Sequence, residues 1–261
     1  MLGAIIGDIV GSIYEFYPIK TKEFTFFHEK CFFTDDTVLT LAIAQALMDG
    51  GKETDYIKNL KTFTINYDRR RYGGRFIRWA LNDDQEAYNS YGNGSAMRVS
   101  PVAWWFNTLK EVESAAKDSA LVTHSHPEGI KGAQATAACI YLARTGASKE
   151  EIKNYIEKSY AYDLSRSLAA IRPDYSYDIT CQGSVPEAII AFLESADYED
   201  TIRNAISLGG DADTLAAIAG SIAEGFYGIP NEFKEMALSY LDEDLCEVYN
   251  EFKIRLEMKQ Q

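Results

Sequence analysis

The chain has 261 residues, of which 46% are apolar and 13% aromatic, so it can build a sizeable core and does not belong to the disordered class. Its formal net charge is −13, from 26 basic and 39 acidic side chains. This balance argues against a nucleic-acid partner or an anionic membrane, because both require clustered Lys and Arg. We expect one folded domain over residues 1–261.

The N-terminal segment and the cysteines indicate a cytoplasmic protein. The first eight residues lack a basic region, and Asp8 interrupts their apolar run well short of a membrane span. The four cysteines are widely separated, and none forms a Cys-x-x-Cys pair. We therefore expect a reduced, cytoplasmic protein. We also expect it to be a monomer.

Helical periodicity recurs along the chain, whereas alternating β-branched runs are scarce. The sequence therefore predicts an all-α fold. Residues 160–183 are polar and irregular, and we expect their stretch Arg172-Pro173-Asp174-Tyr175 to form a loop bordering a cleft. In chain order, the predicted helices are Leu2–Tyr14, Asp35–Met48, Thr54–Asn66, Ala96–Phe106, Lys110–Thr123, Pro127–Arg144, Lys149–Ser159, Val185–Glu194, Glu199–Ser207, Asp211–Phe226 and Asn231–Glu257.

The first predicted helix carries Gly3, Gly7 and Gly11 at helical spacing, which indicates close packing against a neighbour. Glu15 follows at its end. A carboxylate beside a metal site can accept a proton from water. An ordinary solvated acid at a helix end gives the same pattern, and position alone favours that second interpretation for Glu15.

The second predicted helix begins with the motif Thr34-Asp35-Asp36-Thr37. A threonine cap with two carboxylates in the first turn is explained by helix capping and the helix dipole alone. A metal-binding role explains it equally well. This motif by itself leaves the structural and the functional interpretation balanced.

Three features in the middle of the chain have both a structural and a ligand-binding interpretation. The basic cluster at residues 69–78 could meet a phosphate, but a solvated helix end is favoured. The Gly-rich and polar loop 89–95 suits a phosphate or ribose cradle and a plain connection equally. His124 and His126 lack a third histidine nearby, so hydrogen bonding to a ligand is favoured over metal binding.

The motif Asp211-Ala212-Asp213-Thr214 repeats the chemistry of the first acidic motif at another helix start, after Gly209-Gly210. Carboxylates and hydroxyls are hard oxygen donors that suit Mg²⁺, Mn²⁺ or Ca²⁺, and the absence of a Cys or His cluster argues against zinc. Converging carboxylates would repel one another without cations. The two motifs together therefore predict a divalent metal site.

Several motifs, in this order and spacing, resemble the ADP-ribosylglycohydrolase family, which includes the dinitrogenase reductase-activating glycohydrolases. The resemblance runs from about residue 2 to residue 230. Each motif is weak alone, but their order is highly specific. The motifs are Gly7-Asp8 with Glu15, Phe33-Thr34-Asp35-Asp36-Thr37, Tyr72-Gly73-Gly74-Arg75, the run from Tyr91 to Arg98, the run from Thr123 to Pro127, and the run from Gly209 to Thr214.

The resemblance implies a compact, orthogonal all-α bundle with a binuclear Mg²⁺ site, where Mn²⁺ is an alternative. It implies hydrolysis of the C1″ bond of ADP-ribosylated protein or a small ADP-ribose conjugate, with ADP-ribosyl-arginine as the leading substrate. Glu15 and Asp36 are the candidate catalytic carboxylates. The implied metal ligands are Thr34, Asp35, Asp36, Asp211, Asp213 and Thr214, and the implied substrate-binding residues are Asn89, Ser90, Tyr91, Gly94 and His124.

Two alternatives stay open. The chain could bind ADP-ribose without turnover, although its complete set of ligand-type residues and Glu15 argue against this. It could also be a metal-dependent hydrolase of another phosphorylated nucleoside or sugar, because a fold does not determine a substrate. The acceptor group stays open too, since serine-linked, polymeric, nucleic-acid-linked and O-acetyl ADP-ribose are further candidates.

Overall fold

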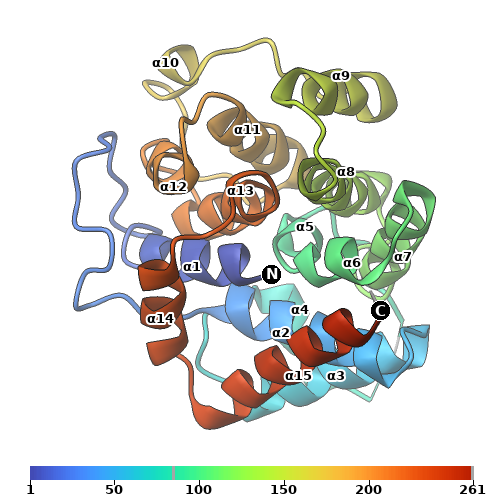
Figure 1. Ribbon diagram of the computed structural model, residues 1–261. Coiled ribbons are helices and arrows are strands. Elements are labelled where there is room, and N and C mark those ends of the chain that lie inside the picture. The colour runs from blue at the N-terminus through green and yellow to red at the C-terminus, as the bar shows by residue number, and fades with distance from the viewer. Residues whose placement is uncertain (84–85, 260–261) are drawn as a thin grey trace.

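The computed structural model describes residues 1–83 and 86–259, and these residues form α-helices joined by loops (Figure 1). The all-α fold class predicted from the sequence is confirmed for them. The helices are α1 (Leu2–Gly11), α2 (Asp35–Asp49), α3 (Glu53–Asn66), α4 (Gly74–Leu81), α5 (Gly94–Met97), α6 (Ser100–Trp105), α7 (Leu109–Leu121), α8 (Pro127–Arg144), α9 (Lys149–Tyr160), α10 (Leu168–Ile171), α11 (Cys181–Leu193), α12 (Tyr198–Ile206), α13 (Ala212–Tyr227), α14 (Asn231–Ser239) and α15 (Glu243–Lys259).

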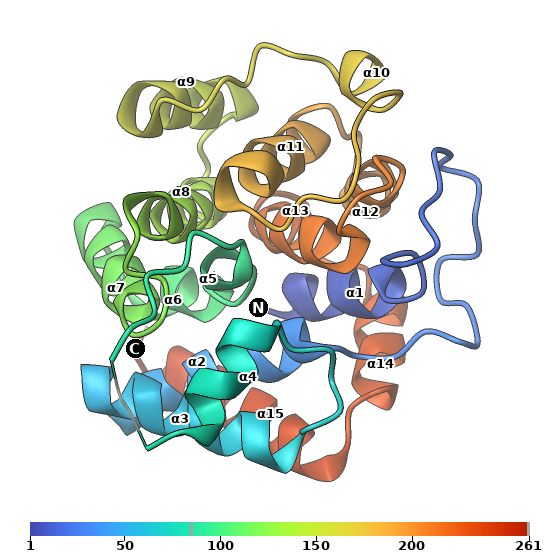
Figure 2. The ribbon, with the colours of Figure 1, turned by 180° about the vertical axis from the view of Figure 1, so that it is seen from behind.

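Helix α13 lies in the middle of the fold and packs against α1, α8, α11 and α12 (Figure 1). A second group, in which α2 contacts α3 and α15 and α3 contacts α4, lies below it in the reverse view (Figure 2). Every residue of α1 is buried between these groups. Among the described residues, no helix combines the length and apolar character that crossing a membrane requires. The domain boundaries 1–261 stay a prediction, and residues 84, 85, 260 and 261 lie outside the described part.

Helices α1 and α13 run antiparallel and pack unusually closely, because α1 presents glycines to its neighbour. A Cβ atom on Gly7 would lie 2.1 Å from the carbonyl oxygen of Ala216, and one on Gly11 would lie 2.5 Å from the Cα of Asp213. Only a residue without a side chain fits at such distances. The glycine spacing predicted close packing, and this packing brings Asp8 of α1 beside the start of α13.

Two predicted helices are each interrupted in the structure. The helix predicted over Ala96–Phe106 is wrong: α5 ends at Met97 and α6 begins at Ser100. Pro101 causes the break, because it has no N–H and its ring would clash with the carbonyl four residues earlier. The helix predicted over Asn231–Glu257 is also wrong, since Asp242 starts a new helix by accepting a hydrogen bond from the N–H of Leu245 at 3.0 Å.

The other differences concern helix ends and short helices. Helix α1 stops at Gly11, short of the predicted Tyr14, where the Ser12 hydroxyl donates to the Ile9 carbonyl and competes with the backbone. Helix α11 begins at Cys181, ahead of the predicted Val185, because Thr180 caps it. Helices α4 and α10 were not predicted, and α10 lies within the stretch 160–183 that was interpreted as irregular.

Candidate functional site

Asp8 of α1 lies beside the start of α2 and is fully buried. Its carboxylate accepts hydrogen bonds from the backbone N–H and the hydroxyl of Thr34, at 2.9 and 2.6 Å, and from the same groups of Thr37, at 3.0 and 2.5 Å. Burial raises the pKa of Asp8 to about 6, and these four hydrogen bonds limit the rise. Asp8 therefore attaches the first acidic motif to α1.

Asp35 and Asp36 occupy the first turn of α2, with Thr34 as the N-cap. The Thr34 hydroxyl donates to Asp8 and accepts from the N–H of Asp36 at 3.3 Å. Burial, followed by repulsion from Asp8, raises the pKa of both carboxyl groups well above the usual range. The Oδ1 atom of Asp36 is buried without a hydrogen-bond partner, which is costly for a carboxylate unless another ligand meets it.

The second acidic motif begins α13 after a Gly-Gly turn, in which Gly209 has φ +66°. The Asn93 side chain donates to Asp211 at 2.7 Å and thereby orients it. The Thr214 hydroxyl donates to Asp36 at 3.3 Å and joins the two motifs. Burial raises the pKa of Asp211 to about 6, while burial and the neighbouring Asp211 raise that of Asp213 well above its usual range.

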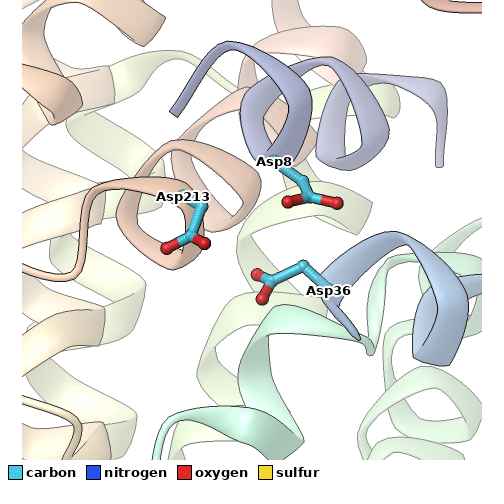
Figure 3. A group of neighbouring side chains, drawn as sticks. All are labelled: Asp8, Asp36 and Asp213. Carbon is cyan, nitrogen blue, oxygen red and sulfur yellow. The ribbon is translucent and has the colours of Figure 1, made fainter. Parts of the chain in front are cut away.

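The carboxylates form two groups that share one member. Asp8, Asp36 and Asp213 point toward one another from three helices (Figure 3). Glu15 and Asp211 form a second group with Asp213, and within each group the ligand atoms lie within 4.8 Å of one another. Such crowding of buried negative charge is relieved by protonation or by cations. The all-oxygen donor set and the unpartnered Asp36 oxygen fit a hard divalent cation.

Glu15 lies just beyond α1 and lines the same cavity as the acidic motifs. Arg71 donates to its Oε2 atom at 2.8 Å, and the Tyr177 hydroxyl donates to its Oε1 atom at 3.3 Å. Its side chain is only 9% exposed. Arg71 and Tyr177 therefore fix Glu15 within the site. The interpretation of Glu15 as a solvated helix-end acid is wrong.

The cavity encloses about 270 Å³ above the acidic motifs, and several cationic or polar side chains also line it. Arg71 and Arg75 come from the basic cluster that was interpreted as a solvated helix end. Both residues are exposed, as that interpretation expects, and both also line the cavity, where Arg71 pairs with Glu15. Arg98 is completely buried, and burial lowers its pKa to about 10. Its Nε and Nη1 atoms have no hydrogen-bond partner. The cavity thus combines a group of carboxylates with cationic side chains, of which Arg98 has two donor atoms without a partner.

His124 lines the cavity in a neutral form. Its Nδ1 atom lies 2.8 Å from the Thr123 hydroxyl, which also accepts from Arg98 at 2.8 Å. Burial, followed by the charges of Arg98 and Arg75, lowers the pKa of His124 well below its usual range. Its Nε2 atom faces Gly94, where an added Cβ would lie 3.3 Å away. His126 instead caps α8, accepting from the N–H of Glu128 at 3.1 Å.

The predicted site residues fall into two sets. Of these residues, the lining of the cavity contains Glu15, Asp35, Asp36, Ser90, Gly94, His124, Asp211, Asp213 and Thr214. Thr34, Asn89 and Tyr91 lie outside the lining; Tyr91 is 45% exposed with its ring near His126, and Asn89 has φ +51°. The roles proposed for all these residues stay predictions.

The sequence assigned no individual role to five residues of the site, which are Asp8, Arg71, Asn93, Arg98 and Tyr177. Asp8, Asn93 and Arg98 lie within the motifs of the family resemblance, and Arg71 lies in the basic cluster. Asp8 had a signal, since a charged residue interrupts the apolar first helix. Asn93 lay between two glycines of a loop already selected. Tyr177 lies two residues beyond the stretch expected to border a cleft, but no local pattern pairs it with Glu15, which it reaches from a loop far along the chain. That loop is paired with the loop of Asn93 through a bridge between Gly92 and Thr180.

Comparison with known proteins identifies the family. The family model for ADP-ribosylglycohydrolase matches residues 1–259. The chain is 26% identical to human ADP-ribosylhydrolase ARH3, covering 94% of this chain and 90% of that protein. It is 28% identical to ADP-ribosylarginine hydrolase Tri1 of Pseudomonas putida, covering 88% of this chain and 70% of that protein.

A solved structure described as an ADP-ribosylglycohydrolase-related protein complex is similar to the fold, with a TM-score of 0.71 and 25% identity. The similarity covers 92% of this chain and 94% of that one. The family model, the relatives and the fold agree along nearly the whole length. The chain therefore belongs to the ADP-ribosylglycohydrolase family, as its motifs predicted.

Proposed function

We propose that the protein hydrolyses the C1″ glycosidic bond of ADP-ribosylated substrates and releases ADP-ribose. The observation that carries this proposal is the pair of carboxylate groups that share Asp213 in a cavity also lined by three arginines, of which Arg98 has two donor atoms without a partner. An ADP-ribose unit offers vicinal hydroxyls that suit a metal site and a diphosphate that suits cationic donors. The carboxylates and the cationic side chains of the cavity thus each have a matching group in one ligand.

The carboxylates are proposed to hold two Mg²⁺ ions, with Mn²⁺ as the alternative. When bound, the ions supply Lewis-acid binding of ribose hydroxyls and water, and they neutralise the crowded negative charge. The proposed ligands come from both acidic motifs, whose hydroxyls and carboxylates are hard donors. They are Thr34, Asp35, Asp36, Asp211, Asp213 and Thr214.

The protein residues orient the substrate and move the proton. Glu15 is proposed to take the proton of the attacking water, with Asp36 as the other candidate. His124, being neutral, can donate a hydrogen bond from Nε2 if its Nδ1 accepts the Thr123 hydroxyl proton. It is proposed to bind the diphosphate together with Ser90 and Gly94, while Asn89 and Tyr91 act at the rim.

The leading substrate is ADP-ribosyl-arginine on protein. Support comes from Tri1, whose name specifies ADP-ribosylarginine, while the ARH3 relatives carry the general name ADP-ribosylhydrolase. A panel of arginine-linked peptide, serine-linked peptide and O-acetyl-ADP-ribose tests the acceptor, with released ADP-ribose as the readout. Release from the arginine-linked peptide alone would establish this acceptor, and release from the others alone would replace it.

The first experiment is isothermal titration of metal-free protein with ADP-ribose, without and then with Mg²⁺. We expect binding only with Mg²⁺, because the carboxylates repel an anionic ligand until cations neutralise them. Asp213→Ala is the matched control, since it removes the carboxylate common to both groups. Binding without turnover of any substrate would make the protein an ADP-ribose-binding protein, and no binding at all would contradict the assignment.

Glu15→Gln tests the proposed proton acceptor. We expect ADP-ribose affinity and Mg²⁺ binding within about threefold of wild type, and turnover reduced by about 10²-fold or more, because the amide keeps the shape but cannot take a proton. Single-turnover kinetics and titration measure the two effects separately. A loss of affinity with unaltered rate would assign Glu15 to binding instead.

A further inference from the structure

Arg71 adopts a backbone conformation that is unfavourable for any residue with a side chain. Its φ is +69°, in the left-handed region that glycine enters without strain. Among the described residues, only Asn89 and Ala161 share this property without being glycine. Two glycines, Gly73 and Gly74, lie close by in the chain. A side chain kept at such a position must have interactions that offset the strain.

The guanidinium group of Arg71 makes several such interactions. Its Nη1 atom donates to Oε2 of Glu15 at 2.8 Å and to the carbonyl oxygen of Ser12 at 2.9 Å. Its centre lies 5.0 Å from the ring of Phe16 and 4.5 Å from the ring of Phe32. Arg71 therefore contacts the turn that follows α1 and forms an ion pair with Glu15 in that turn.

Glu15 needs such a partner because of its surroundings. It lies in the turn beyond α1, where no helix fixes its side chain. Its carboxylate belongs to the group that includes Asp211 and Asp213, both of which repel it. The guanidinium of Arg71, 2.8 Å from the carboxylate, offsets this repulsion and sets its direction. Tyr177 holds the other oxygen, but only at 3.3 Å.

We propose that Arg71 is a positioning residue for the reaction, which holds the Glu15 carboxylate at the second carboxylate group in the orientation needed to take a proton. This inference rests on the proposed hydrolase function. Arg71 acts through Glu15 and does not itself contact the reacting atoms. The left-handed backbone at residue 71 occurs together with this ion pair, whose energy offsets the strain.

Arg71→Gly separates positioning from stability, because glycine relieves the backbone strain while it removes the guanidinium. We expect kcat to fall by about tenfold or more, as for other residues that orient an active-site group. KM and the affinity for ADP-ribose should stay within about twofold. The melting temperature should stay unchanged or rise. A purely structural role predicts the opposite pattern, with a lower melting temperature and an unaltered kcat.

Three further measurements sharpen the test. Arg69→Ala removes a neighbouring exposed charge outside the cavity and should leave kcat unchanged. Arg71→Lys keeps the charge and should recover part of the lost rate. Free guanidinium chloride at millimolar concentration should raise the rate of Arg71→Gly but not of wild type, by occupying the site of the missing side chain.

A double-mutant cycle ties the effect to Glu15. In the Glu15→Gln background, Arg71→Gly should cause no additional loss of kcat, because the group that it orients has already lost its function. Additive losses, or full activity of Arg71→Gly, would overturn the inference while leaving the hydrolase function intact. No turnover by wild type with any ADP-ribosylated substrate would overturn the proposed function and this inference with it.

Discussion

The two acidic motifs look nearly alike in the sequence, yet the fold supports them differently. At the start of α2, both threonines donate their hydroxyl protons to Asp8, so the hydroxyls serve to attach the motif to α1. At the start of α13, no side chain caps the helix, and Asp211 is oriented by Asn93 from a loop. Thr214 donates across to Asp36.

This difference shows that two motifs of similar sequence need not contribute equally to folding and to function. The first motif contains residues whose hydrogen bonds are satisfied inside the fold. The second motif depends on groups that lie around the cavity. Substitutions at corresponding positions of the two motifs should therefore separate effects on stability from effects on metal and substrate.

The largest effect should come from Asp213→Ala. Asp213 belongs to both carboxylate groups, so its removal should abolish turnover and the thermal stabilisation by Mg²⁺. Asp35→Ala in the first motif should also abolish turnover. Activity assays and melting curves with and without Mg²⁺ measure both. Unchanged activity in either variant would contradict the two-motif metal site.

The fourth positions of the motifs provide a matched pair. Thr37→Val removes a 2.5 Å hydrogen bond to buried Asp8 and should lower the free energy of unfolding by about 1.5–3 kcal/mol. Thr214→Val should leave metal-free stability nearly unchanged but weaken Mg²⁺ binding by about tenfold. Urea unfolding in EDTA and Mg²⁺ titration measure the two quantities. Equal behaviour of both variants would remove the distinction between the motifs.

Asn93→Ala tests whether the second motif depends on its loop. Without the 2.7 Å hydrogen bond from Asn93, Asp211 should lose its orientation, and Mg²⁺ affinity should fall by about tenfold. Asn93→Asp should be worse, because it adds a carboxylate beside Asp211. Calorimetric titration with Mg²⁺ measures both variants. Wild-type affinity in Asn93→Ala would show that the loop is dispensable for the motif.

The last expected effect concerns the pH dependence of stability. The pKa values of Asp8 and Asp211, both raised to about 6, mean that the folded state holds protons which the unfolded state releases near pH 4. Stability in EDTA should therefore fall as the pH rises from about 4 through 6. Mg²⁺ should oppose this fall, so the melting-temperature shift it causes should grow over the same range. A shift that shrinks with rising pH would contradict this.

The sequence by itself determined the all-α class, most of the long helices and the identity of the family. Local patterns suffice for these, because helical periodicity and capping residues act within a few turns of chain. The two acidic motifs could be selected for the same reason, since oxygen donors in the first turn of a helix form a local pattern. Glycines at helical spacing predicted close packing of the first helix, but not that α13 would be its partner.

Only the tertiary structure decided which groups meet. Asp8, Asp36 and Asp213 come from three helices, and the glycine-lined contact of α1 with α13 brings them together (Figure 3). Arg71 and Tyr177 reach Glu15 from segments 56 and 162 residues away. No local sequence pattern predicts these contacts, because they depend on how the helices pack and on which loops lie beside the cavity. Burial, which sets the charge of these groups, likewise exists only in the assembled fold.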